Sequence, residues 1–398
     1  MDTNRHWTAV ISAVLSVILL CSVTLAAAAE DDLPVPVSTK EQLNRIRDNL
    51  AGNYYLTEDL VFTEADFAPG GDFYNAGAGF VPIGSGKKPF TGSFDGKGHL
   101  ISGLRISVSG KVYTMDFSST GSDDGWTGDY IIGSNPGAST VSPGVGLFGV
   151  STGTVRNVTI ADSTVQGGST NQAAVYVGGL IGYNAGEVSC CAVNGGTVIG
   201  DMNSYVGGLI GYQNGGSVRD CFARLSGISS GVHGGLVGAL KTGTVSTSYS
   251  AVSFPLAAGA IGLVIEASAA VSNCFYISDT AYGETATAVR RNQSADAAQY
   301  NGFDFDTNWY LCKPYLAPAL RGLSLPDPVL MGDVNNSGKV DLEDIVHLAQ
   351  YLAGWQIEIR LEAANVSCDQ NEDGSARIAL TDVVYLAQHL AGWEDREL

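Results

Sequence analysis

The chain is poor in charge, in cysteine and in long apolar runs. Only 15% of its 398 residues are charged, and its 21 basic residues form no stripe of the kind that binds nucleic acid. The 51 glycines follow no Gly-X-Y period, which excludes collagen. Beyond the N-terminal region, no segment is apolar enough to span a bilayer. The formal net charge of −19 likewise argues against nucleic acid as a partner.

Residues 1–29 have the pattern of a secretory signal peptide. Arg5 precedes an apolar run from Ala9 to Leu25, and the small residues Ala27–Ala29 form a cleavage site before Glu30. A membrane anchor is the alternative, although the run is rather short for one. We therefore expect a secreted chain, extracellular or associated with a cell surface, that has no membrane span after cleavage. Export also permits disulfides among the six remaining cysteines.

The middle of the chain is an internal repeat. A glycine-flanked Leu recurs every 27–33 residues, and each copy is followed by a Val and then by a third repeated position. The Leu series is Leu147, Leu180, Leu209, Leu236 and, in a degenerate copy, Leu263. The Val series is Val155, Val188, Val218, Val245 and Val271. The third series is Val158, Cys191, Cys221, Ser248 and Cys274.

A repeat of this length, with short β-branched runs and glycine turns, excludes a helical solenoid, which needs long segments of period 3.6. It predicts a mainly β fold, a right-handed parallel β-helix in which equivalent residues of successive coils stack. The Leu and Val series would then form internal ladders. The cysteine column would consist of buried thiols that pack as small apolar groups. A disulfide between neighbouring coils is the alternative.

The copies resemble the GLUG motif, which is named for its Gly-Leu-x-Gly core and occurs in bacterial and archaeal surface proteins. The resemblance covers residues 144–275 and implies a pectate-lyase-like solenoid, without implying lyase activity. We place the whole β-helix at residues 30–323. Within it, Ser38 to Glu41 predict a capping box and a helix that covers the first coil. We expect residues 107–143 to form an insertion, and we expect residues 300–323 to form an aromatic cap at the far end of the β-helix.

A linker at residues 324–331 leads to a duplicated segment at residues 332–393. Asp344–Trp355 and Asp382–Trp393 are two copies of one helical pattern, each preceded by an Asx-rich loop. In the first loop, oxygen-bearing side chains alternate, Gly338 is sixth and Asp344 closes the loop at the twelfth place. Calcium requires this spacing, because alternate side chains point inward and Gly permits the sharp turn.

The duplicated segment resembles a dockerin, a small all-α module that binds calcium and plugs into a cohesin domain. The resemblance therefore implies a cohesin-bearing scaffold or surface protein as the partner. The ligands that it implies in the first loop are Asp333, Asn335, Ser337, Asp341, Asp344 and the backbone carbonyl of Lys339. Those in the second loop are Asp369, Asn371, Asp373 and Asp382. The residues that it implies as partner contacts are Leu342, Glu343, Leu380 and Thr381.

The second loop departs from the dockerin pattern. It is two residues longer than the first, and Ala379 offers no side-chain oxygen at the ninth place counted from its closing end. We therefore expect one strong and one weaker calcium site. The two halves are expected to pack together through apolar helix residues, namely Val346, Leu348, Leu352, Val383, Leu386 and Leu390.

The function predicted is that of a secreted β-helix anchored into a multiprotein or cell-surface assembly by its calcium module. The β-helix would serve as an adhesive, spacer or carbohydrate-binding surface. Because dockerins often carry glycoside hydrolases or polysaccharide lyases, a polysaccharide-degrading enzyme is the alternative. A surface-layer component with a stiffened tail is a third reading. We name no catalytic residue, because the carboxylates of the repeat coils are scattered, namely Asp162, Glu187, Asp201, Asp220 and Glu266.

Overall fold

The computed structural model divides into two compact units, residues 1–326 and 327–398. It describes residues 33–112, 140–141, 144–171, 173–229, 231–252, 259–281, 285–312, 317–326, 332–335, 337, 339–357, 359–367 and 377–392. The predicted signal peptide, three ligands of the second loop and most of the predicted insertion lie outside the described residues. The unit boundary falls within the segment that the sequence analysis assigned to the linker.

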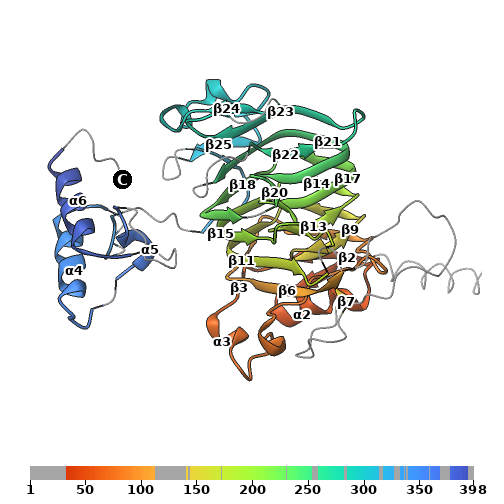
Figure 1. Cartoon of the computed structure of the whole chain (residues 1–398), viewed down its shortest axis with the longest axis horizontal. Coiled ribbons are helices and arrows are strands. Elements are labelled where there is room, and N and C mark those ends of the chain that lie inside the picture. Colours follow the sequence, from red (N-terminus) through yellow and green to blue (C-terminus); the bar gives the residue numbers. More distant parts are fainter. Residues whose placement is uncertain are drawn as a thin grey trace, which may run out of the picture. The chain divides into compact units, whose positions relative to one another are not determined.

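The first unit is mainly β, and its strands stack as parallel coils (Figure 1). Among the described residues, twenty strands form one sheet system, and four more, β8, β12, β16 and β20, form a second sheet. The strands of the early coils are β1 (Val35–Val37), β2 (Asn53–Leu56), β3 (Leu60–Val61), β4 (Ser93–Asp95), β5 (Leu100–Ser102), β6 (Arg105–Val112) and β7 (Thr140–Val141).

The repeat coils contribute the remaining parallel strands. They are β8 (Gly144–Val145), β9 (Phe148–Ser151), β10 (Thr154–Arg156), β11 (Thr159–Ser169), β12 (Tyr176–Gly178), β13 (Ile181–Asn184), β14 (Glu187–Ser189), β15 (Ala192–Ile199), β16 (Tyr205–Gly207), β17 (Ile210–Arg219), β18 (Phe222–Leu225), β19 (Gly227–Ser229), β20 (Val232–Gly234), β21 (Val237–Val252), β22 (Ile261–Val264), β23 (Ala270–Ile277) and β24 (Thr287–Val289).

The strand register establishes how the coils stack. Phe148 pairs with Ile181, which pairs with Ile210, then Val237 and then Ile261, so successive coils advance by 33, 29, 27 and 24 residues. Pairing between equivalent strands of consecutive turns is the arrangement of a parallel β-helix. The predicted fold class is confirmed to this extent, while the predicted right-handed turn stays a prediction.

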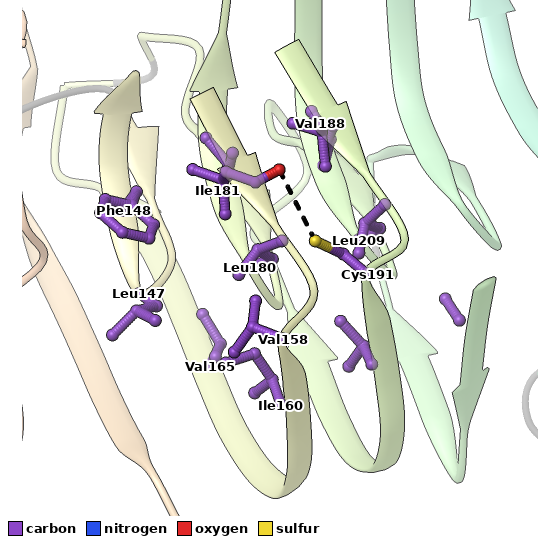
Figure 2. Packing of buried hydrophobic residues seen from close by; sticks show 14 of the residues in the cluster. Leu147, Phe148, Val158, Ile160, Val165, Leu180, Ile181, Val188, Cys191 and Leu209 are labelled. Atoms are coloured by element: carbon purple, nitrogen blue, oxygen red, sulfur yellow. Dashed lines mark hydrogen bonds between the residues drawn. The ribbon is translucent and has the colours of Figure 1, made fainter. Parts of the chain in front are cut away.

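The internal ladders are confirmed except at one position. The five Val residues pair in register from Val155 to Val271. The first four Leu residues are fully buried, and Figure 2 shows Leu147, Leu180 and Leu209 side by side in the core. Leu263, however, pairs with Ala239 and is 40% exposed. The prediction for Leu263 was wrong, because the fifth copy is Gly259–Gly262 and places the buried Ala260 in the ladder.

The glycines of the repeat are required by close backbone packing. A Cβ atom at Gly207 would collide with the carbonyl oxygen of Ile210. A Cβ atom at Gly211 would collide with the backbone nitrogen of Val177 in the preceding coil. Because a side chain at either place would displace backbone, only glycine fits at these two strand positions.

A column of left-handed residues turns the chain at one corner of the coils. The residue after β10, β14 and β17, and its equivalents within β21 and β23, has φ between 44° and 55°. These residues are Asn157, Cys190, Asp220, Thr247 and Asn273. Asn and Asp tolerate this conformation well, whereas a β-branched residue such as Thr247 adopts it rarely. The corner is therefore set by the stacking of neighbouring coils as well as by local preference.

The N-terminal helix is present but begins one residue later than predicted. Helix α2 (Lys40–Arg45) is capped by Thr39, which accepts from the amide of Gln42, so the predicted capping box at Ser38 was wrong. Leu43 and the following Ile46 are fully buried against the core. Figure 1 shows α2 at the end of the stack that holds the first strands. A second short helix, α3 (Glu64–Phe67), follows.

Two predictions for the flanking segments need correction. Strand β6 pairs with β11 as far as Gly110, so the first residues of the predicted insertion continue a coil.

Residues 300–312 and 317–324, here called the return segment, do not cover the far end. They form the antiparallel pair β25 (Trp309–Cys312) and β26 (Ala317–Leu320) and pack on the outer face of the coils. Their aromatic side chains contact Phe222, Tyr249 and Phe275.

The return segment leads the chain back toward the early coils. Phe222, Tyr249 and Phe275 form one outward column, because the residues beside them point into the core. The hydroxyl of Tyr249 donates to the carbonyl of Pro318 at 2.5 Å, and the amide of Ser324 donates to the carbonyl of Gly98 at 2.6 Å. The segment therefore extends from the coil of Phe275 to the much earlier coil of Gly98.

The second unit is helical where it is described. It contains α4 (Leu342–Leu352), α5 (Leu361–Ala364) and α6 (Leu380–Leu390). Its small core is formed by Val334, Leu348, Ala364, Val366 and Leu386. Among the described residues, no helix of either unit has the length and apolar character needed to cross a membrane.

Candidate functional site

The candidate site lies where the two long helices of the second unit begin. Helix α4 starts after Asp341, whose side chain caps the helix by accepting from the amide of Glu343 at 2.8 Å. Helix α6 starts after Ala379, which has no capping side chain. Asp344 and Asp382 occupy the same place in the first turn of their helices, so the predicted alignment of the two copies from their closing ends is correct.

Two fully buried carboxylates mark these helix starts. Asp344 accepts from the amides of Asn335 and Asp341 at 3.1 and 2.8 Å, and it is 0% exposed. Asp382 is equally buried and accepts from the amide of Ala379 at 2.8 Å. Within the described part of the unit, neither carboxylate has an ion pair with Lys, Arg or His. A buried carboxylate without a cation is costly, and this is the condition that a bound metal ion relieves.

The first loop gathers oxygen atoms around Ser337. The Ser337 amide donates to the side-chain oxygens of Asp333 and Asn335 at 2.8 and 3.0 Å. The Ser337 hydroxyl lies 3.4 Å from Asp333 Oδ1 and 3.3 Å from the carbonyl oxygen of Lys339. Ligand oxygens that share a calcium ion at about 2.4 Å and roughly right angles lie about 3.4 Å apart. The donor set consists of oxygen atoms, the ligand type that calcium takes, and two of its oxygen pairs have about this spacing.

The carboxylates of the first loop are less closely grouped than its other oxygens. In the described part of the chain, no three Asp, Glu, His or Cys side chains are arranged to hold a metal ion. Asp341 and Asp344 are instead joined through the backbone, because Asp344 accepts from the Asp341 amide. The structure thus brings together Asp333, Asn335, Ser337 and Lys339, and it connects Asp344 to them through the Asn335 amide.

The second half holds its closing carboxylate differently. Both the amide and the hydroxyl of Ser367 donate to Asp382 Oδ1, at 2.8 and 2.7 Å. No hydroxyl is bonded to Asp344 among the corresponding described contacts of the first half. The predicted ligands Asp369, Asn371 and Asp373 lie outside the described residues. The sequence analysis missed Ser367, although a hydroxyl just before an Asx-rich loop is a recognisable turn signal.

The predicted partner contacts lie on the surface at matching places. Leu342 and Leu380 are 72% and 69% exposed, and Glu343 and Thr381 beside them are also exposed. Val346 and Val384, one helical turn further on, are 50% and 48% exposed. Leu348 and Leu386 pack the halves together as predicted. Val346 and Leu352 were wrongly assigned to this core, because both are exposed, at 50% and 36%.

The cysteine column of the first unit consists of free thiols among the described residues. Cys191, Cys221 and Cys274 are buried, and each donates to the carbonyl of the residue two places before it. Figure 2 also shows the Cys191 thiol directed at a main-chain oxygen of the preceding coil, that of Val155. Burial raises the pKa of Cys274 to about 12 and holds the pKa of Cys221 well above its ordinary value. These thiols are therefore packing groups.

The carboxylates of the repeat coils each have a neighbouring partner. Asp220 pairs with Arg219 at 3.2 Å and accepts from the Thr247 hydroxyl at 2.7 Å. Glu266 lies 4.0 Å from Lys241. Asp201 accepts from the amide of Asn203 and the hydroxyl of Ser204, while Glu187 accepts from Ser217. These contacts tie the carboxylates to neighbouring residues of the coils.

Comparison with protein-family models agrees with the repeat. Residues 202–224 match the family model described as the GLUG motif, within the range that the sequence analysis assigned to it. A crystal structure from Bacteroides ovatus, provisionally named an immunoglobulin A1 protease, is similar at 17% identity and a TM-score of 0.45. It covers 73% of this chain and 93% of its own. No curated protein matches the chain. The chain is thus a β-rich protein that contains a GLUG motif.

Proposed function

We propose that the second unit is a calcium-dependent module of the dockerin type that anchors the β-helix to a cohesin domain of a scaffold or surface protein. The observation that carries this proposal is the pair Asp344 and Asp382. Both are fully buried acids at equivalent helix starts, without a cationic partner in the described residues. Calcium would be held by Asp333, Asn335, Ser337, Lys339, Asp341 and Asp344, where it would neutralise the clustered negative charge.

The exposed leucines at the starts of the two helices also support this proposal. A monomer places few large aliphatic side chains in solvent at more than two-thirds exposure, so Leu342 and Leu380 are candidate anchors for a partner. Glu343 and Thr381 would contribute polar contacts beside them. Calcium would act on this surface indirectly, by fixing the loop that precedes each helix.

The chain would be exported and would remain extracellular or at a cell surface, with its N-terminal signal removed. In this location the β-helix would serve as an adhesive, a spacer or a carbohydrate-binding surface. The stacked coils support such a role, because a solenoid presents a long outer face on which equivalent positions repeat.

A capture experiment tests the proposal. The whole chain is passed over immobilised cohesin domains in calcium and then in excess chelator. We expect capture in calcium alone, and we expect the double variant Leu342→Ala/Leu380→Ala to lose it. Val61→Ala is the matched control, because Val61 is 56% exposed on the first unit. Capture that persists in chelator, or that survives the double variant, would contradict the proposal.

A further inference from the structure

Four tyrosines from two neighbouring coils form a cluster on the outside of the β-helix, here called the tyrosine block. Tyr176 and Tyr205 come from β12 and β16, and Tyr183 and Tyr212 come from β13 and β17. Their ring centroids lie 4.6–5.9 Å apart in five contacts. The sequence analysis did not single out these residues, because they lie on either side of the repeat core that it followed.

The block faces outward. Val177 and Val206, which follow Tyr176 and Tyr205 in the chain, belong to the internal core, so the two tyrosines point to the opposite side of the sheet. Tyr183 is buried by the other rings, whereas Tyr176, Tyr205 and Tyr212 are partly exposed. The solenoid does not need these rings to fill its interior.

The block ends abruptly along the stack. In the column of Tyr176, the position in the preceding coil is Gly144, which has no side chain. In the column of Tyr212, the position in the following coil is Ala239, which has only a methyl group. Each end of the block therefore has a tyrosine ring that no large side chain of its own column covers.

A row of neutral polar groups runs beside the rings. The Asn214 amide nitrogen donates to the Tyr183 hydroxyl at 2.6 Å, and the Thr242 hydroxyl donates to the Asn214 side-chain oxygen at 3.1 Å. Both Asn214 and Thr242 are partly exposed and keep capacity for further hydrogen bonds. The nearby charges of Lys241 and Glu266 lie 4.0 Å apart and offset each other.

From this arrangement we propose that the tyrosine block is a binding site for a neutral glycan chain. A sugar ring has apolar C–H faces and hydroxyl edges, which complement aromatic rings bordered by an amide and a hydroxyl. The inference deepens the proposed function, because it assigns the carbohydrate-binding role to one surface of the β-helix. Binding through neutral groups should depend little on ionic strength.

The test is calorimetry on the whole chain in calcium, with cellohexaose, xylohexaose and mannohexaose as neutral probes and hexagalacturonate as the charged one. We expect at least one neutral hexasaccharide to bind. We expect Tyr212→Ala and Tyr176→Ala each to weaken that binding by about two- to tenfold, the effect of losing one aromatic contact. Tyr212→Phe, which keeps the ring, should bind like the parent.

Tyr55→Ala is the matched control, because Tyr55 is a partly exposed tyrosine in β2, outside the block. Thermal unfolding of each variant reports whether the fold is kept, and the comparison of neutral with charged probes on the parent chain still tests the proposal if the alanine variants unfold. The proposal is overturned if no neutral probe binds, if only hexagalacturonate binds, or if folded alanine variants bind as well as the parent. Repeating the titration in chelator separates the two proposals, because glycan binding should persist when calcium-dependent docking is lost.

Discussion

Asp382 repeats the position and one hydrogen bond of Asp344, 38 residues further along the chain. In each case Oδ2 accepts the amide of the residue three places before it, at 2.8 Å. The two carboxylates differ at Oδ1, which accepts from the Asn335 amide in the first half and from both donors of Ser367 in the second. The halves thus share a backbone frame but differ in how the closing acid is held.

Removing the charge of Asp344 should weaken calcium binding. Asp344→Asn keeps the size of the side chain but removes a negative ligand, so we expect the calcium affinity of the first loop to fall at least about tenfold. Calorimetric titration of the whole chain measures this change. Glu343→Gln is the control, because Glu343 is exposed and is not a predicted ligand. Equal affinities for the parent and Asp344→Asn would refute the assignment.

Ser367 should stabilise the second half without any ion. Ser367→Ala removes a hydroxyl that donates to a buried carboxylate at 2.7 Å, a bond worth about 1.5–3 kcal/mol. We expect the melting temperature of the second unit, followed by calorimetry in chelator, to fall accordingly. The exposed Thr381→Ala serves as the reference substitution. An unchanged transition in Ser367→Ala would show that the hydroxyl does not hold Asp382 in place.

The corrected repeat register can be tested with two leucines. Leu209 is fully buried in the internal ladder, so Leu209→Ala should destabilise the first unit by about 2–5 kcal/mol. Leu263 is 40% exposed, and Leu263→Ala should cost less than about 1 kcal/mol. Urea unfolding of both variants measures the difference in free energy. Comparable losses in the free energy of unfolding would show that Leu263 belongs to the internal ladder.

The buried thiols should make the β-helix sensitive to alkali. Burial raises the pKa of Cys274 from 9.0 to about 12, so the folded thiol keeps its proton when the unfolded thiol has lost it. The unfolded state then binds fewer protons, and stability falls as the pH rises from about 9 toward 12. Burial also raises the pKa of Tyr212 to about 12, which acts in the same direction.

Urea midpoints measured between pH 8 and 11 follow this loss. Cys274→Ser should reduce the slope, because a hydroxyl does not titrate in this range, and Ser248 already occupies the same column. A midpoint that stays constant over the whole range would argue against the protonation linkage.

The regular part of the fold could be predicted because each coil repeats the same packing problem. Val155 to Val271 could be aligned from sequence, since only a β-branched residue recurs at that place. Leu263 was assigned to the Leu series because it follows a Gly, as the other members do. In the structure, the smaller Ala260 occupies that position of the ladder. The left-handed Cys190 and Thr247 could not be foreseen, because their conformation is imposed by neighbouring coils.

Long-range contacts explain why the predicted aromatic cap was wrong and why Ser367 was missed. The aromatic residues around Trp309 were predicted to cover an end, because bulky apolar residues after a repeat suggest a cap. No local pattern indicates that they pack on the outer column of Phe222 and Tyr249 instead. For the candidate site, the loop spacing identified Asp333 and Asp344, but the role of Ser367 depends on a contact across fifteen residues.

The bond between Ser324 and Gly98 limits how the repeat array can change. The return segment must reach from the coil of Phe275 to that of Gly98, and each coil adds about 4.8 Å to this path. Inserting one more GLUG copy between them would lengthen this path by about one such step. A chain that gains a coil by duplication would therefore keep the bond between Ser324 and Gly98 only if the return segment also spans the added step.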